Sequence, residues 1–156
     1  LKCFNESTYL KLTGGKLQPV LDALKIYRDE GVWLEITNLI VPGWTDKTDE
    51  IRAMCQWLSS AGFMEVPIHF SRFHPMYKLE NLPPTPAAIL NTAATIAAEA
   101  GMKYIYIDNL PGTAMDDTLC PACGQKVVER SGFRIVSNRI ANGKCNCGTV
   151  IPGVWK

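Results

Sequence analysis

Four cysteines near the C-terminus have the spacing of a metal site. Cys120 and Cys123 belong to a C-P-A-C-G run, and Cys145 and Cys147 belong to a C-N-C-G run. Two thiolates separated by two residues can grip one tetrahedral ion, and the glycine that follows lets the turn close with backbone N–H groups facing sulfur. We therefore expect these four cysteines to hold one metal ion in a closed, structural shell.

Zinc is the metal that we expect there, ahead of iron or an iron–sulfur cluster, because four thiolates are typical of structural zinc sites. Residues 126–130 and 133–137 are predicted to form a hairpin around Ser131 and Gly132, so the cysteine pairs bracket a hairpin as in a zinc ribbon. The second pair is C-x-C, which departs from the usual C-x-x-C. Two disulfides, or reduced thiols in a small core, are the alternatives, and disulfides are disfavoured because nothing suggests secretion.

Two histidines and their polar neighbours are the other groups that could do chemistry. His74 lies just past a predicted strand, together with Arg72, and such a place suits substrate binding better than packing. His69 lies inside that strand and is expected to be a hydrogen-bonded residue of a core or barrel. Glu35 lies in an apolar strand, where an unpaired carboxylate is costly. It either pairs with a cation such as Lys2 or faces a polar cavity, and we favour the cavity.

Trp33 and Trp44 are expected to pack rather than to stack on a ligand. Cys3 and Cys55 are expected to be ordinary thiols, with Cys55 in the core on the apolar face of a helix. We therefore assign them no part in metal binding.

Strands and helices alternate along the first 108 residues, and this alternation must position those side chains. Strands are predicted at 1–4, 32–41, 66–70 and 104–108, and helices at 6–12, 17–28, 49–60 and from Pro86 to Gly101, the last with Thr85 as its N-cap. The order is typical of a parallel sheet with crossover helices. Four strands make half of a barrel or of a doubly wound sheet, and in both folds ligands lie at the C-terminal ends of the strands.

Charge and cysteine content both change near Leu119. Residues 1–119 carry 10 Lys or Arg and 14 Asp or Glu, whereas residues 120–156 carry 6 basic residues and one acid, Glu129. We therefore predict two domains, 1–119 and 120–156.

The whole chain has 156 residues, 47% of them hydrophobic, and a net charge of +1. A packed core is expected from that composition, and the charge balance gives no general attraction to nucleic acid or membrane. No apolar run approaches the roughly 20 residues of a membrane span. A cytoplasmic protein without membrane partners is expected.

Several sequence runs, in this order, resemble the C-terminal portion of radical S-adenosylmethionine (SAM) enzymes. The runs are LKCFNESTYLKLTGG, LIVPGWTD, SRFHPMYKLENLPPTP, KYIYIDNLPG, the CPACG tail and the final IPGVW. The group they resemble is the radical SAM enzyme of the AmmeMemoRadiSam system, which is similar to pyruvate formate-lyase activating enzyme. The resemblance covers nearly all of the chain.

The resemblance implies the C-terminal half of a partial (β/α)6, TIM-like barrel with a small zinc-ribbon-like subdomain. It implies SAM and a [4Fe–4S] cluster as cofactors of the complete enzyme, which would cleave SAM to a 5′-deoxyadenosyl radical that abstracts hydrogen. The C-x-x-x-C-x-x-C motif that holds the cluster is absent here. Because the chain also begins with Leu1 instead of Met, we expect it to be a piece of a longer polypeptide, inactive alone and without catalytic residues of its own.

Several residues receive roles from the resemblance alone. Lys2 matches a D-L-K run whose strand end lies beside SAM, and 41–43 (Val41, Pro42, Gly43) matches the segment that backs the adenine. His74 matches a histidine that faces the substrate opening. Thr37 stands where the activating enzymes carry an arginine that contacts SAM, which argues against glycyl-radical activation. Glu35 and Thr37 alternate onto one strand face, so both are expected to point into the barrel.

The sequence predicts the substrate and the protein partners less directly than the fold. The complete enzyme would act on a protein or a small molecule, with partner proteins from the same gene system. An alternative is a binding module whose basic ribbon contacts nucleic acid or protein, although interspersed charges with few exposed aromatics make nucleic acid a poor fit. An unpaired first strand would also favour self-association.

Overall fold

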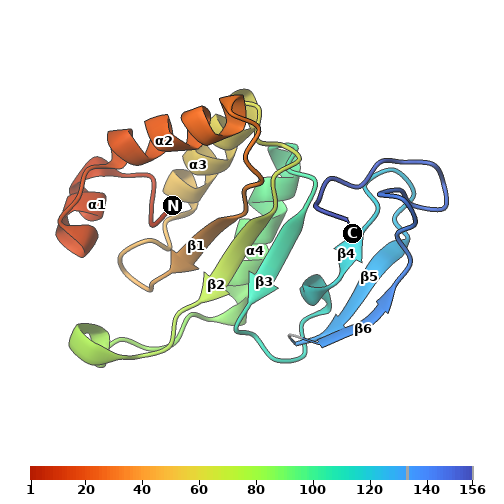
Figure 1. The fold of residues 1–156 in the computed structure, drawn as a ribbon. Coiled ribbons are helices and arrows are strands. Elements are labelled where there is room, and N and C mark those ends of the chain that lie inside the picture. The colour runs from red at the N-terminus through yellow and green to blue at the C-terminus, as the bar shows by residue number, and fades with distance from the viewer. Residues whose placement is uncertain (133, 156) are drawn as a thin grey trace. The chain divides into compact units, whose positions relative to one another are not determined.

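The structure, a computed structural model, describes residues 1–132 and 134–155. It divides into two compact units, residues 1–110 and 111–156, each with its own three-stranded sheet (Figure 1). This division lies before the predicted boundary at Leu119. The reason is that β4 (Thr118–Leu119) pairs with β5 (Lys126–Ser131), so residues 111–119 belong with the cysteine-rich unit.

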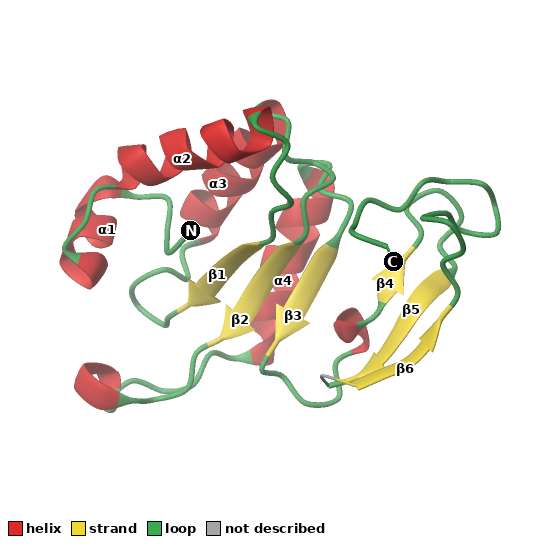
Figure 2. Cartoon of the chain, viewed as in Figure 1, coloured by secondary structure: helices red, strands yellow, loops and turns green. Residues whose placement is uncertain are grey.

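The sheet of the first unit is parallel, as predicted. Its strands, in spatial order, are β1 (Ile36–Ile40), β2 (Ile68–Arg72) and β3 (Ile105–Asp108). The crossover helices α3 (Thr48–Ser60) and α4 (Ala87–Glu99) lie on the same face of this sheet (Figure 2). The opposite face is therefore free of crossover helices, and all three strands end at one edge.

Two further helices precede the sheet, close to their predicted bounds. They are α1 (Glu6–Thr13) and α2 (Leu17–Asp29). The side chain of Asn5 accepts the N–H of Thr8 at 3.0 Å and caps α1 as expected. Gly14 ends α1 in a left-handed conformation, with φ of 71°.

Side-chain alternation in the strands separates a buried face from an open one. The helix-covered face buries Ile36, Ile40, Ile68, Phe70 and Ile107. Burial of each such side chain contributes about 1.5–3 kcal/mol, so this face holds the unit together. The intervening row, Thr37, His69 and Tyr106, aligns across the three strands on the other face.

Residues 1–4 lie beside β1 but do not form the predicted strand. The amine of Leu1 donates to the carbonyl of Thr37 at 3.0 Å. The carbonyls of Leu1 and Lys2, however, accept hydrogen bonds from the side chain of Asn38. A side chain thus takes the place of the backbone donors that a ladder needs, and the sheet has three strands instead of four.

The other strands also differ from their predicted bounds. The predicted strand 32–41 begins only at Ile36, whose neighbour on β2 is Ile68. Among the described residues no strand pairs with Val32 or Trp33, which are 50% and 41% exposed. Apolar, β-branched residues indicated a strand there, but a strand forms only where a neighbour pairs with it.

Thr85 does not cap α4, contrary to the prediction. Its hydroxyl donates to the carbonyl of Ile40 at 2.6 Å and accepts the N–H of Phe73 at 2.8 Å. Thr85 is fully buried, and Pro86 occupies the N-cap position instead. The hydroxyl therefore joins the ends of two strands.

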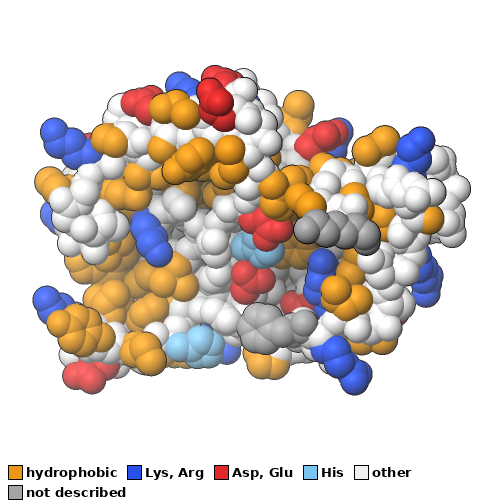
Figure 3. Space-filling view, viewed as in Figure 1, with side chains coloured by type: hydrophobic (Ala, Val, Ile, Leu, Met, Phe, Trp, Pro, Cys, Tyr) orange, Lys and Arg blue, Asp and Glu red, His pale blue; other side chains and the backbone are white. Residues whose placement is uncertain are grey.

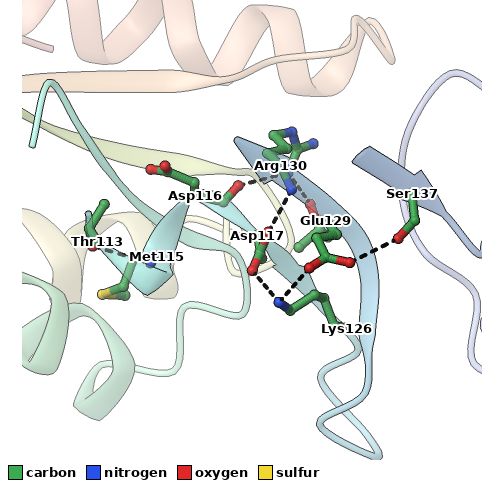
Figure 4. Close-up of polar contacts among 9 residues, drawn as sticks. Thr113, Met115, Asp116, Asp117, Lys126, Glu129, Arg130 and Ser137 are labelled. Carbon is green, nitrogen blue, oxygen red and sulfur yellow. Dashed lines mark hydrogen bonds and ion pairs between the residues drawn. The ribbon is translucent and has the colours of Figure 1, made fainter. Parts of the chain in front are cut away.

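The second unit is an antiparallel sheet of β4, β5 and β6 (Arg134–Asn138). The predicted hairpin is confirmed in β5 and β6, while Phe133 lies outside the described residues. Asp117 anchors β5 (Figure 4): its carboxylate lies 2.8 Å from Lys126 Nζ and accepts the backbone N–H of Arg130. Although desolvation opposes the charge, these partners lower the pKa of Asp117.

Two short 3₁₀ turns complete the described chain, η1 (Tyr77–Leu79) and η2 (Ala114–Asp116). No helix among the described residues is long and apolar enough to cross a membrane.

Candidate metal centre and sheet-face site

The four predicted cysteines come together in the second unit. Their sulfur atoms all lie within 4.8 Å of one another. Cys120 Sγ lies 3.6 Å from Cys147 Sγ, and Cys123 Sγ lies 3.7 Å from Cys145 Sγ. Four sulfurs at about 2.3 Å from a tetrahedral zinc ion are about 3.8 Å apart, so this donor set fits such an ion.

The two cysteine turns have matching backbone hydrogen bonds. In the first, the N–H of Cys120 donates to the carbonyl of Gln125, and the N–H of Gly124 donates to Cys120. In the second, Cys145 donates to Thr149, and Gly148 donates to Cys145. The C-x-C pair therefore forms the same turn with one residue fewer, and the departure from C-x-x-C does not displace its sulfurs.

The free thiols differ in acidity. The hydroxyl and N–H of Thr149 lower the pKa of Cys147 to about 6. Desolvation raises the pKa of Cys120, but backbone N–H groups outweigh it and hold that pKa below its usual range. An N–H of Gln125 favours the Cys123 thiolate, yet desolvation and the neighbouring thiols raise its pKa to about 12. Four thiolates so close together repel one another, and a bound cation removes that repulsion.

The alternative of two disulfides does not match the structure. All six cysteines are free thiols, and sulfur atoms 3.6 Å apart are well beyond a disulfide bond of about 2.0 Å. Cys3 and Cys55 belong to the first unit, in which both are buried. Neither can supply the three-cysteine motif of a [4Fe–4S] cluster, so the first unit does not fit that cofactor.

A second polar group lies on the open face of the parallel sheet. His69 of β2 lies between two carboxylates: its Nε2 is 3.3 Å from Glu35 Oε2, and its Nδ1 is 3.2 Å from Asp108 Oδ2. Its ring stacks on Tyr106 with centroids 4.8 Å apart. Ser71 donates to Asp108 at 3.4 Å. Figure 3 shows acidic side chains beside a histidine on this face. We call these five residues the sheet-face cluster.

The two carboxylates favour the charged form of His69. Desolvation lowers the pKa of His69, but the hydrogen bond to Asp108 and the charges of Asp108 and Glu35 outweigh it, so the pKa is raised. The side chain of His69 is only 22% exposed, whereas Glu35 is 54% exposed. The cluster therefore presents a charged, hydrogen-bonding surface on a face that no crossover helix covers.

Glu35 thus pairs with His69 and also accepts the indole N–H of Trp33 at 3.4 Å. Among the described residues no contact joins Glu35 to Lys2. Trp33, which was expected to pack, is 41% exposed. Thr37 is exposed on the same face, in the row of His69. Lys2 is exposed, and its backbone carbonyl accepts from Asn38. Glu35 and Thr37 therefore share a face as the alternation predicts.

The remaining predicted residues lie where β1 and β2 end. Residues 41–43 form the turn after β1, in which Gly43 has φ of 76° and Val41 is buried. Arg72 donates to the carbonyl of Thr85, so its guanidinium secures a loop. His74 is exposed, with Nε2 3.4 Å from the carbonyl of Asn109. These residues do not join the sheet-face cluster.

Three members of the cluster were not singled out from the sequence: Ser71, Tyr106 and Asp108. The available signal was their spacing, because Ser71 lies two residues after His69 and Asp108 two residues after Tyr106. Residues two apart in a strand share a face. Only the register, which places His69 beside Tyr106 and Ser71 beside Asp108, brings the two pairs together.

Comparison with known sequences finds a relative that is similar over most of the chain. No family model matches the chain. An uncharacterized protein of Methanocaldococcus jannaschii is 40% identical over 150 residues, which cover 94% of this chain and 45% of that protein. The chain thus spans less than half the length of this relative.

A solved structure has a similar fold. A domain of a pyruvate-formate lyase-activating enzyme from Bacteroides vulgatus superposes with a TM-score of 0.61 at 12% sequence identity. The match covers 70% of this chain and 64% of that domain. At this identity the likeness is one of fold, and it supports the resemblance to radical SAM enzymes at that level.

Proposed function

We propose that the chain is the later part of a radical SAM enzyme of the AmmeMemoRadiSam type, in which the open face of β1, β2 and β3 lines the chamber for SAM and substrate. The first unit would form the later strands of a partial (β/α)6 barrel. Sequential strand order and crossover helices on one face support this proposal. A barrel places its helices outside and its ligands within, toward the C-terminal ends of the strands.

The sheet-face cluster is the observation that carries the proposal. A face meant for packing against another layer would be apolar, whereas on this one Glu35 and Asp108 each contact His69. Charged groups at such a place are costly in a dry core and useful in a ligand chamber. These side chains would bind and orient a polar ligand.

This chain would supply ligands for some of the proposed cofactors but not for the iron–sulfur cluster. SAM, when reduced by an iron–sulfur cluster, supplies the radical chemistry, and the cluster ligands would lie outside this chain because the first unit does not fit them. The residues that would contact SAM or substrate are Lys2, Glu35, Thr37, the 41–43 turn, Arg72 and His74. The second unit would bind zinc through its four cysteines as a structural ribbon, with iron as the alternative metal.

The experiment uses the longer protein that contains this chain. Incubated anaerobically with SAM and a reductant, it should release methionine and 5′-deoxyadenosine, while residues 1–156 alone release neither. His69→Gln in the longer protein should lower the rate by roughly tenfold or more, in keeping with loss of an oriented polar contact. Glu65→Gln removes an exposed carboxylate that pairs with Lys103 and should leave the rate unchanged.

Two results would contradict the proposal. One is a longer protein that carries no iron–sulfur cluster and does not cleave SAM. The other is SAM cleavage by residues 1–156 alone, because those residues would then contain the reactive centre.

A further inference from the structure

A small cavity lies on the helix-covered side of β1, between the N-terminal segment and the start of α3. Its volume is about 10 Å³, close to the least that one water molecule or small ion requires. Cys3, Asn38, Thr45 and Glu50 supply its polar wall, and Phe4 and apolar residues of α3 complete it. The cavity is separate from the sheet-face cluster, which lies on the other side of the sheet.

Asn38 lines the cavity and has a side-chain oxygen without a partner in the described chain. Its Nδ2 donates to the carbonyls of Leu1 at 2.9 Å and Lys2 at 3.2 Å. Turning the amide over would place Oδ1 against those two carbonyl oxygens, so the hydrogen bonds fix its orientation. The residue is 2% exposed, and Oδ1 has no partner among the described residues.

Glu50 adds a second unpaired oxygen. It is the third residue of α3, and its Oε1 lies 3.2 Å from Lys47 Nζ. Its Oε2 is buried and has no partner in the described chain, while the side chain as a whole is 17% exposed. A carboxylate oxygen buried without a donor is costly.

The side-chain hydrogens of the remaining polar wall are already in use. The hydroxyl of Thr45 donates to the carbonyl of Leu39 at 2.9 Å and accepts the N–H of Val41. The thiol of Cys3 points to the carbonyl of Asn5 at 3.6 Å. The side chains around the cavity therefore offer lone pairs and no free hydrogen. A water molecule there could donate to two oxygens, but it would find no side-chain donor for its own lone pairs.

We infer that this cavity binds a monovalent cation through Asn38 Oδ1 and Glu50 Oε2. Its wall carries one formal negative charge, from Glu50, and that carboxylate is already shared with Lys47. Calcium takes six to eight oxygen ligands, commonly including several carboxylates, and magnesium keeps an octahedral shell, so the donor set suits sodium or potassium better. The ion would tie the N-terminal segment to β1 and α3. The inference does not depend on the proposed function.

Thermal unfolding of the whole chain tests the site. Melting temperatures are compared in sodium, potassium and choline chloride at equal ionic strength, because choline is too large for the cavity. Sodium or potassium at about ten times its dissociation constant should raise the melting temperature by roughly 3–6 °C over choline. Equal melting temperatures in all three salts would overturn the inference.

Matched variants identify the ligand. Glu50→Gln keeps the size of the side chain and removes the charge, so it should abolish the difference between salts. Glu65→Gln removes a carboxylate that also pairs with a lysine, but away from the cavity, and should retain the difference. If both variants retain it, the ion does not bind at Glu50.

Crystals soaked in a thallium(I) salt give a test that needs no variant, so it holds even if Glu50→Gln fails to fold. An anomalous peak between Asn38 Oδ1 and Glu50 Oε2 is expected, since thallium(I) replaces potassium. A water molecule there, without anomalous signal, would refute the cation.

Discussion

At the scale of single residues, His69 shares its two ring nitrogens between two carboxylates. Its pKa is raised, because the hydrogen bond to Asp108 and the charges of Asp108 and Glu35 outweigh desolvation. The stabilisation from the charged imidazole is therefore complete below the unfolded-state pKa of about 6.5 and is lost as the pH rises through the higher, folded-state pKa.

Asp108→Asn should lower the pKa of His69, as measured by NMR titration of the ring protons. The same variant should reduce the free energy of unfolding near pH 6 by about 1 kcal/mol. His74→Gln, which alters the other histidine, is the control and should leave the titration of His69 unchanged. An unaltered midpoint in Asp108→Asn would show that the contact does not form in solution.

The four cysteines give a second prediction at this scale. Cys120→Ser should reduce zinc content from about one ion per chain to near zero, because a three-sulfur shell binds the ion less tightly. Limited proteolysis should then cut within residues 111–156 while residues 1–110 stay resistant, since the two units are separately compact.

Cys55→Ala is the control for that experiment. It removes a buried thiol of the first unit and should keep full metal content. Retention of metal and of protease resistance in Cys120→Ser would contradict a four-cysteine site.

At the scale of elements, one hydroxyl joins the ends of β1 and β2. Thr85→Val keeps the shape of the side chain but leaves the carbonyl of Ile40 and the N–H of Phe73 buried without this partner. We expect a loss of roughly 2–4 kcal/mol in the free energy of unfolding, measured by urea denaturation.

Thr92 provides a matched comparison. Its hydroxyl donates to the carbonyl of Ala88 on the exposed face of α4, so Thr92→Val should change stability by less than about 0.5 kcal/mol. If the two valine variants are equally stable, the two hydrogen bonds of the Thr85 hydroxyl contribute nothing to the free energy of unfolding.

At the scale of the whole molecule, the first sheet has two edges and an open face. At its outer edge, away from β2, β1 accepts a hydrogen bond from the amine of Leu1. β2 is the only strand that pairs with β3 among the described residues. Unpaired edge strands tend to pair with other chains. Light scattering on residues 1–156 should therefore give a mass that rises with concentration, and a constant monomer mass would count against this expectation.

Local patterns in the sequence were sufficient for the helices and for the two cysteine turns. Each depends on residues close together in the chain: the side-chain period of a helix, the cap at Asn5, or two cysteines in one turn. The hydrogen bonds that form these features close within a few residues, so sequence spacing describes them directly.

Tertiary structure alone decided which distant groups meet. His69 and Asp108 are 39 residues apart, and only the register of β2 with β3 aligns them. Thr85 has the sequence context of a helix cap, yet it serves two strand ends, because burial gives its hydroxyl better-placed partners. Likewise, residues 1–4 do not form a strand beside β1, because the side chain of Asn38 donates to the carbonyls of Leu1 and Lys2. In each case the partner is chosen by packing, which the order of residues does not reveal.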